Sequence, residues 1–288
     1  EPHTLRPAVC GHLRHDRPEE RRRRCDRRHV EVDVRTALVW RAVLALARHQ
    51  HVASRRVAQP GHRDNLLRRG EHLIGRRVAG GERIIGKKIG VTSQAVMDML
   101  GVRQPDFGQL TDAMVVDQGG SVAMAGLIQP KAEGEIAFVL KHDLSGPGIT
   151  AADVLRATEG VMACFEIVDS RIRDWKIKIQ DTVADNASCG VFVLSDRLVS
   201  PRDLDLYTTG MVLEKNGRIV GTGAGAATMG SPVIAVAWLA NTLGRLGMSL
   251  KAGEVILSGA LSAMVPVVAG DNLRVSIAGI GSCSVRFD

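Results

Sequence analysis

The sequence KAEGEIAFVLKHDL at residues 131–144, followed about twenty residues later by CFEIVDSRI at 164–172, decides the fold of this chain. Five consecutive apolar residues at 136–140 include β-branched and aromatic types, and they predict a buried strand. Strand side chains alternate between two faces, so Glu133 and Glu135 share one face. The opposite face carries the large apolar side chains Ile136, Phe138 and Leu140.

A second short strand is predicted at 165–168, and it carries Glu166 in similarly apolar surroundings. Carboxylates crowded beside a buried strand repel one another and lose hydration, which is unfavourable unless a cation compensates. Three converging carboxylates suit a hard divalent ion, Mg²⁺ or Mn²⁺, rather than zinc. The alternative is that the E-x-E pair is solvated on an edge strand and that Glu166 pairs with Arg171 or Arg173.

Around these strands the chain joins short strand-like pieces to a few helices. RIIGKKIG at 83–90 reads as a strand, PDFG at 105–108 as a turn, and Asn216-Gly217 as the turn of a hairpin. Helices are expected from Thr150 to about Cys164 and from Pro232 to Leu246. This mixture favours an α+β domain dominated by β-strands over a parallel βαβ sheet.

Eight motifs follow one another in the order and spacing of a known family. They are GKKIGVTS at 86–93, PDFG at 105–108, EGEIAFVL at 133–140, FEIVDSRIRDWKI at 165–177, DNAS at 185–188, GAGAATMGSP at 223–232, AWLAN at 237–241 and GEVILSGALSAMVP at 253–266. Through them the chain from about Arg76 to Asp288 resembles the 2-keto-4-pentenoate hydratases of the fumarylacetoacetate hydrolase superfamily. The resemblance implies that superfamily's mixed β-roll with a few flanking helices. It also implies a hydro-lyase that converts 2-hydroxypenta-2,4-dienoate into 4-hydroxy-2-oxopentanoate in aromatic and steroid meta-cleavage catabolism.

The resemblance also implies roles for individual side chains. It places Lys88 in the active site with Lys87 as a variable neighbour, and it makes Asp106 a candidate proton carrier. It makes Ser188 a candidate substrate-binding hydroxyl, and the three glutamates would hold Mg²⁺ or Mn²⁺. Taken alone, these residues have plainer interpretations: a surface lysine pair, an Asx turn contact and a loop hydrogen bond, respectively.

Other functions remain open at this point. A 4-oxalocrotonate (2-oxo-3-enedioate) decarboxylase shares the superfamily, the metal site and most of the motifs. A C–C bond hydrolase of the fumarylacetoacetate type is less favoured, because the only histidine after residue 72 is His142, in a loop with no acid partner evident. A non-catalytic binding protein that uses a basic N-terminal arm is the alternative from another class.

The net charge of +7 is unevenly distributed along the 288 residues. Residues 1–72 contain seventeen Arg, no Lys and nine acidic residues, whereas residues 73–288 contain 21 basic and 22 acidic residues. We therefore expect residues 73–288 to form the catalytic domain. Because this part is nearly neutral, we expect it to bind neither nucleic acid nor an anionic membrane surface.

Residues 1–72 differ from the rest of the chain. They contain eight of the nine histidines and the basic run RRRRCDRR at 21–28, which is typical of a solvated, disordered segment. A nucleic-acid-binding arm is disfavoured because Trp40 is the only aromatic residue there. Enrichment in Arg, His, Ala and Val without Lys is also typical of an out-of-frame reading of a GC-rich gene. We hypothesise a frameshift or misassigned start, with the frame resuming near 73–78, which resequencing the gene would test.

The sequence also predicts where the protein works and what it binds. Five scattered cysteines without a CxxC pair fit a reduced cytosolic protein, and the N-terminus shows no apolar signal region. No apolar run of membrane-spanning length is expected, since 255–268 is short and interrupted. We expect a cytoplasmic enzyme with a small 2-oxo or 2-hydroxy dienoic acid as substrate. The family resemblance adds a homo-oligomer, with the pathway aldolase as a candidate partner.

Overall fold

The structure is a computed structural model, and it describes residues 73–288. The expectations for residues 1–72, disorder and a foreign reading frame, lie outside the described residues. The domain boundary expected after residue 72 stays a prediction for the same reason.

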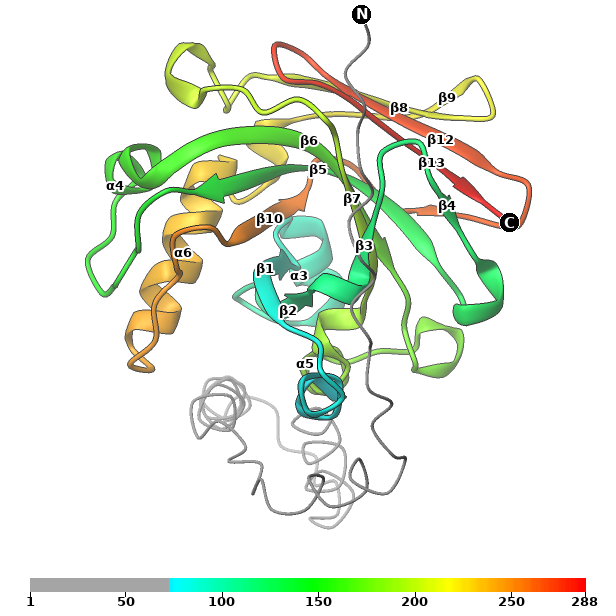
Figure 1. Cartoon of the computed structure of the whole chain (residues 1–288), viewed down its shortest axis with the longest axis horizontal. Coiled ribbons are helices and arrows are strands. Elements are labelled where there is room, and N and C mark those ends of the chain that lie inside the picture. The colour runs from blue at the N-terminus through cyan, green and yellow to red at the C-terminus, as the bar shows by residue number, and fades with distance from the viewer. Residues whose placement is uncertain (1–72) are drawn as a thin grey trace, which may run out of the picture. The chain divides into compact units, whose positions relative to one another are not determined.

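Two β-sheets and a few helices form the described part of the chain (Figure 1). The larger sheet has the order β2-β1-β10-β5-β6-β7-β3, with β11 paired to β5, and the smaller has the order β4-β13-β12-β8-β9. The strands are β1 (Ile84–Gly90), β2 (Asp106–Thr111), β3 (Val115–Val116), β4 (Ser121–Val122), β5 (Lys131–Leu140), β6 (Thr158–Val168), β7 (Cys189–Leu194), β8 (Gly210–Lys215), β9 (Arg218–Ala224), β10 (Val255–Ala260), β11 (Val265–Pro266), β12 (Asn272–Ile277) and β13 (Gly281–Phe287). The helices are α3 (Gln94–Leu100), α4 (Ala151–Ala157), α5 (Ile179–Ala184) and α6 (Pro232–Gly244), and residues 73–79 are also helical. The expected strand-dominated α+β fold is confirmed.

Strand β5 lies in the middle of the larger sheet, between β10 and β6, and both neighbours run antiparallel to it. Its apolar face, with Ile136, Phe138 and Leu140, belongs to the main core, which also contains inward-facing residues of β8, β12, β13 and α6. Ala137 lies on the other face, in a smaller apolar cluster with Cys164 of β6 and Leu257 of β10. The alternation predicted for 133–140 is therefore confirmed, with Glu133 and Glu135 on the side of the smaller cluster.

The helix predicted from Thr150 to about Cys164 is only half as long as expected. Thr150 does cap α4, accepting a hydrogen bond from the Asp153 N–H, but the helix ends at Ala157 and β6 begins at Thr158. Residues 158–164 continue as strand because they extend the antiparallel pairing with β5, as far as Thr158 opposite Leu140. Long-range strand pairing here overrides the local helical pattern.

The turn predicted for PDFG at 105–108 is also wrong. Asp106 opens β2, which pairs antiparallel with β1, placing Gly90 opposite Asp106 and Lys88 opposite Gly108. All six residues of β2 are buried, so the strand forms inside the domain despite its turn-forming composition. Pro105 precedes the paired residues and so removes no hydrogen bond from the ladder.

The hairpin and the C-terminal helix agree with the sequence analysis. Strands β8 and β9 join through Asn216 (φ 52°) and Gly217 (φ 75°), and both values are positive as a type I′ turn requires. The segment Gly225–Gly244, which the sequence analysis overlooked in naming only 255–268, is long and apolar enough to cross a membrane by length and composition alone, although 56% of its apolar 18-residue window is buried. Its helix α6 packs as a core helix: the 13 residues rise only about 20 Å, and nine of them are buried.

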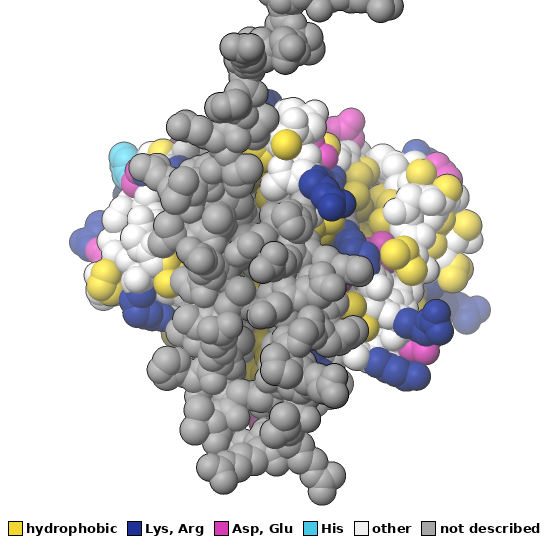
Figure 2. All heavy atoms as spheres, turned by 90° about the horizontal axis from the view of Figure 1, so that it is seen from below, with side chains coloured by type: hydrophobic (Ala, Val, Ile, Leu, Met, Phe, Trp, Pro, Cys, Tyr) yellow, Lys and Arg dark blue, Asp and Glu magenta, His cyan; other side chains and the backbone are white. Residues whose placement is uncertain are grey.

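The surface of the described part carries charges of both signs. Figure 2 shows one face, on which basic side chains lie singly or in small groups beside acidic ones. The expectation that residues 73–288 bind no nucleic acid stays a prediction.

Gly86 allows β1 and β10 to approach closely, since a Cβ there would lie 2.0 Å from the backbone oxygen of Val255. We expect Gly86→Ala to lower the free energy of unfolding by about 1–3 kcal/mol, because no backbone atom can move away without breaking the parallel pairing. Urea unfolding followed by circular dichroism measures this. Gly75→Ala is the control: it lies in the helix at 73–79, where the added Cβ would meet no neighbouring atom of the described residues within 4 Å, and it should stabilise by about 0.5–1 kcal/mol. Equal stabilities of Gly86→Ala and wild type would contradict the account.

Candidate active site

Three glutamates meet on one face of the larger sheet. Glu133 of β5 lies directly opposite Glu166 of β6 in the strand register, and Glu135 is two residues further along β5. One carboxylate oxygen from each lies within 4.8 Å of the others, and we call Glu133, Glu135 and Glu166 the carboxylate cluster. The structure thus brings together the three residues expected to hold a metal.

The carboxylate cluster lies in a poor environment for negative charge. Glu135 and Glu166 are fully buried, and Glu133 is half-buried. Burial, reinforced by the charge of Glu166, raises the pKa of Glu133 to about 7, and the same two causes raise the pKa of Glu135 well above its ordinary value. Burial also raises the pKa of Glu166, although Lys88 opposes it. A nearby cation therefore has a large effect on the pKa of each of these carboxylates.

Lys88 provides one such cation. It is 2% exposed on β1, and its Nζ lies 2.9 Å from Glu166 Oε1. Burial acts to lower the pKa of Lys88, but the charges of Glu166 and Asp106 outweigh it and hold the pKa above its ordinary value. Lys88 is therefore an ammonium throughout the physiological range. Lys87 points to the opposite face and pairs with Glu254 at 2.6 Å, so the two lysines have separate environments.

Asp106 completes the group of charges beside Lys88. It is 4% exposed at the start of β2, and its Oδ1 is buried without a hydrogen-bond partner among residues 73–288. Gly90 lies opposite it, and a Cβ at Gly90 would lie 2.3 Å from Asp106 Oδ1 and 3.3 Å from Lys88 Nζ. The absence of a side chain at Gly90 therefore lets this carboxylate and the ammonium share one space.

Ser188 ends a tight loop next to these strands. Asn186, Ala187 and Ser188 all have φ near +53°, a conformation that costs energy for residues other than glycine. Asn186 holds the loop to β2, accepting from the Gln109 N–H at 2.8 Å and donating to the Gln109 carbonyl at 2.9 Å. The buried Ser188 hydroxyl donates to Asp185 at 3.0 Å, so in this structure it makes the loop contact that was its plainer interpretation.

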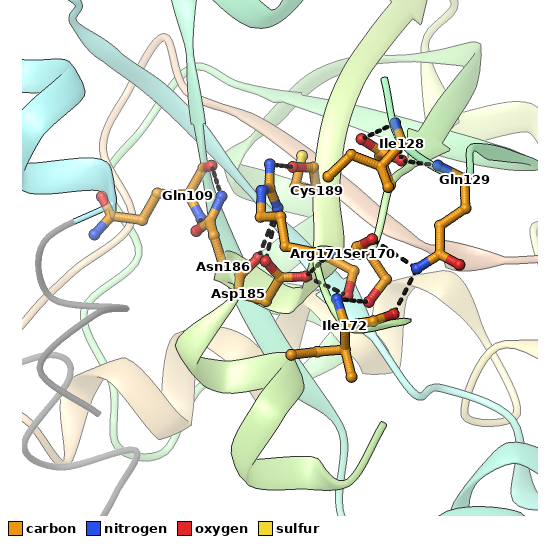
Figure 3. Close-up of polar contacts among 11 residues, drawn as sticks. Gln109, Ile128, Gln129, Ser170, Arg171, Ile172, Asp185, Asn186 and Cys189 are labelled. Carbon is orange, nitrogen blue, oxygen red and sulfur yellow. Dashed lines mark hydrogen bonds and ion pairs between the residues drawn. The ribbon is translucent and has the colours of Figure 1, made fainter. Parts of the chain in front are cut away.

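Arg171 holds the other side of this loop (Figure 3). Its guanidinium donates to the Asp185 carboxylate at 3.0 Å and to the Cys189 carbonyl at 3.2 Å. The alternative pairing of Glu166 with Arg171 or Arg173 does not occur, since Glu166 pairs with Lys88 and Arg171 with Asp185.

Sequence reasoning missed a cation and an aromatic ring at the edge of the site. Lys131 shares the face of β5 with Glu133, and its Nζ lies 4.3 Å from the centroid of the Trp175 ring. Burial lowers the pKa of Lys131, and the charge of Glu133 opposes this shift. The signal was present in the sequence, because Lys131, Glu133 and Glu135 have the spacing of one strand face.

The residues present fit a hard divalent cation. Oxygen ligands on three converging side chains are what Mg²⁺, Mn²⁺ and Ca²⁺ prefer. Among the described residues, Glu135 Oε1 and the carboxylate oxygens of Glu166 are buried without a hydrogen-bond partner, apart from the ion pair of Glu166 with Lys88 and its contact with the Cys189 thiol. Such unsatisfied buried oxygens are costly unless a ligand completes them.

A comparison with protein families matches residues 89–288 to the fumarylacetoacetate (FAA) hydrolase C-terminal family. The chain belongs to the fumarylacetoacetate hydrolase family. A 2-hydroxyhexa-2,4-dienoate hydratase of Comamonas testosteroni is 62% identical over 218 residues, which are 75% of this chain and 83% of the relative. A 2-hydroxypent-2,4-dienoate hydratase of Pseudomonas putida is 68% identical over 178 residues, 62% of this chain and 80% of the relative.

A solved structure has a similar fold. The 4-oxalocrotonate decarboxylase from Pseudomonas putida G7, complexed with magnesium and adipate, matches with a TM-score of 0.75 and 36% identity. The match covers 91% of this chain and 100% of that one. The chain is thus more similar in sequence to the dienoate hydratases than to this decarboxylase, and the resemblance to the hydratase family is confirmed.

Glu135→Gln tests the carboxylate cluster through stability. A neutral amide of the same shape removes a buried like charge, so the metal-free variant should melt at or above the wild-type temperature. Mg²⁺ at 100 times its Kd should stabilise the wild type by about 2.7 kcal/mol and the variant by almost nothing. Thermal unfolding with and without Mg²⁺ measures both. Glu159→Gln, on the exposed side of β6, should keep the full Mg²⁺ shift; a full shift in Glu135→Gln would count against the cluster.

Proposed function

We propose that this chain is a metal-dependent hydratase acting on 2-hydroxypenta-2,4-dienoate, the enol form of 2-oxopent-4-enoate. Its product is 4-hydroxy-2-oxopentanoate, formed in the meta-cleavage catabolism of aromatic compounds or steroids. The observation that carries the proposal is the carboxylate cluster beside a buried lysine, in a chain 62% and 68% identical to dienoate hydratases. The names of these relatives supply the substrate class.

Glu133, Glu135 and Glu166 would hold the divalent ion, which we take to be Mg²⁺ or Mn²⁺. When bound, the ion supplies Lewis-acid polarisation of the substrate carboxylate and the adjacent C2 oxygen. The magnesium in the decarboxylase complex supports the choice of a hard cation. Between Mg²⁺ and Mn²⁺ the oxygen-only donor set has no preference.

The reaction requires two proton movements and one water molecule. The C2 hydroxyl loses a proton and the distal end of the diene gains one, which gives an α,β-unsaturated ketone. Water then adds, with its oxygen at C4 and a proton at C3. The enzyme must therefore offer a group that takes and returns protons next to a fixed positive charge.

Lys88 and Asp106 fit these two requirements. Lys88 stays protonated, so it acts as the fixed positive charge and can donate hydrogen bonds from Nζ. Asp106 has a buried oxygen with no hydrogen-bond partner in the described part of the chain, and that oxygen faces the space left by Gly90, so its carboxylate is placed to carry the proton. Ser188 would bind the substrate only by exchanging its contact with Asp185 for one with the ligand.

Decarboxylation of a 2-oxo-3-enedioate is the second candidate, favoured by the TM-score of 0.75 to the decarboxylase. The two reactions share an electron-withdrawing centre at C1 and C2, so the carboxylate cluster does not separate them. The sequence identities favour the hydratase.

Purified protein should consume 2-hydroxypenta-2,4-dienoate in the presence of Mg²⁺ or Mn²⁺. Loss of the conjugated chromophore with formation of 4-hydroxy-2-oxopentanoate is the expected result, and EDTA should abolish it because the carboxylates alone repel the anionic substrate. Release of CO₂ from 2-oxo-3-enedioate, with no turnover of the dienoate, would instead establish the decarboxylase.

Asp106→Asn keeps the shape of this side chain and removes its basicity. We expect kcat to fall by about 10²–10⁴-fold, the usual contribution of a positioned acid or base, with Mg²⁺ affinity unchanged. Steady-state kinetics and calorimetry measure the two quantities. Asp112→Asn, in the segment after β2, is the matched control and should keep wild-type kcat. A kcat in Asp106→Asn within threefold of wild type would remove Asp106 from the mechanism.

The proposal extends to location and assembly. The apolar helix α6 is part of the core, which agrees with a cytoplasmic enzyme that has no membrane partner. A homo-oligomer, and association with the pathway aldolase that would consume the product, are further parts of the proposal.

A further inference from the structure

The face of β5 that carries the carboxylate cluster becomes less buried towards one end of the strand. Along the face that carries it, Lys131 and Glu133 are half-buried, whereas Glu135 is fully buried, as is Glu166 on β6. The site therefore opens towards Lys131, and we call this end of β5 the mouth of the site. A ligand that reaches the glutamates from this side passes the ammonium of Lys131 first.

Trp175 fixes the position of that ammonium. The Nζ of Lys131 lies 4.3 Å from the centroid of the indole ring, within the range of a cation–π interaction. The indole N–H donates to the Gln129 carbonyl at 3.0 Å, so the ring is anchored to the chain two residues before Lys131. A four-carbon side chain that would otherwise be free is thereby held near one orientation.

The segment that carries Trp175 is itself fastened to the start of β5. The Gln129 side chain donates to the carbonyls of Ser170 and Ile172, and the Asp169 carboxylate accepts from the Ile128 and Gln129 N–H groups (Figure 3). These contacts cross-link residues 128–131 to residues 169–175. The mouth is thus built by two segments that hold Lys131 and Trp175 against each other.

The sum of the charges at the site indicates a role for Lys131. The carboxylate cluster and Asp106 carry four negative charges when ionised, and a divalent ion with Lys88 supplies three positive ones. An approaching carboxylate anion therefore meets a net negative site unless another cation takes part. Lys131 is the next ammonium along the same strand face, and its charge brings the sum to zero.

We propose that Lys131, oriented by Trp175, is a substrate-binding residue that receives the carboxylate of the incoming 2-oxo or 2-hydroxy acid. The inference rests on the proposed function for its substrate class, and it adds a residue and a direction of entry. Because Lys131 contributes to binding rather than to proton movement, it acts on KM and leaves kcat in place.

Lys131→Gln tests this with two independent measurements. We expect the Kd of pyruvate for the Mg²⁺-loaded protein, measured by calorimetry, and the KM for the dienoate to rise at least about tenfold, with kcat within about twofold of wild type. Lys131→Arg keeps the charge, so its Kd for pyruvate and its KM for the dienoate should both stay within about threefold of wild type. Lys141→Gln, at the end of β5 remote from the cluster, is the control and should match wild type.

Variants of Trp175 test the orientation of the Lys131 ammonium separately from its charge. Trp175→Leu removes the ring and should raise the Kd of pyruvate several-fold, whereas Trp175→Phe keeps a ring and should lie between Leu and wild type. If Lys131 served only to balance Glu133, Lys131→Gln would alter the Mg²⁺ affinity of the substrate-free protein and leave the Kd of pyruvate on the loaded protein unchanged, and that result would overturn the inference.

The outcomes also separate this inference from the proposed function. If the wild type binds pyruvate in a Lys131-dependent way but does not hydrate the dienoate, the binding residue stands and the hydratase assignment fails. If the wild type hydrates the dienoate and Lys131→Gln has unchanged KM and Kd, the inference alone fails.

Discussion

The repulsion between buried carboxylates is the constraint on which the rest of this structure depends. Glu133 and Glu166 face each other across neighbouring strands, a placement that is unfavourable for like charges, and Glu135 lies beside them without exposure. Lys88 offsets only part of this, because one ammonium pairs with one of the carboxylates. The sheet must therefore hold the cluster in place by its own pairing and by the apolar core on its other face.

Two glycines show how closely the backbone is fitted to these charges. Gly90 leaves the volume that Asp106 and Lys88 occupy. Gly259 has φ +112°, which suits glycine alone, and its N–H donates to Glu135 Oε2 at 2.8 Å. This hydrogen bond serves one oxygen of Glu135 and leaves the other unsatisfied. An asymmetric arrangement of this kind is expected where a ligand, and not the protein, is to satisfy the second oxygen.

The sequence predicts the carboxylate cluster, which we call the floor of the site, far better than it predicts the residues around that cluster. The alternation of acids and large apolar residues along β5 is a local pattern, so the shared face of Glu133 and Glu135 follows from the spacing alone. Strand β2 and the first half of β6 are fixed by pairing with distant partners, and their local residues suggest a turn and a helix instead. Spacing also puts Lys87 and Lys88 on opposite faces, but only the family resemblance indicated which one is buried.

The floor and the mouth of the site depend on different parts of the fold. This division allows one fold to carry out different reactions. The floor is built from central strands, where a change of one residue disturbs the sheet and the core together. The mouth is built from residues 128–131 and 169–175, which lie mostly in connections and are fastened by side-chain hydrogen bonds to backbone groups. Such connections can change in sequence without loss of the core. A hydratase and a decarboxylase that share the floor can therefore be distinguished by the charges and rings that their mouths present to the incoming substrate.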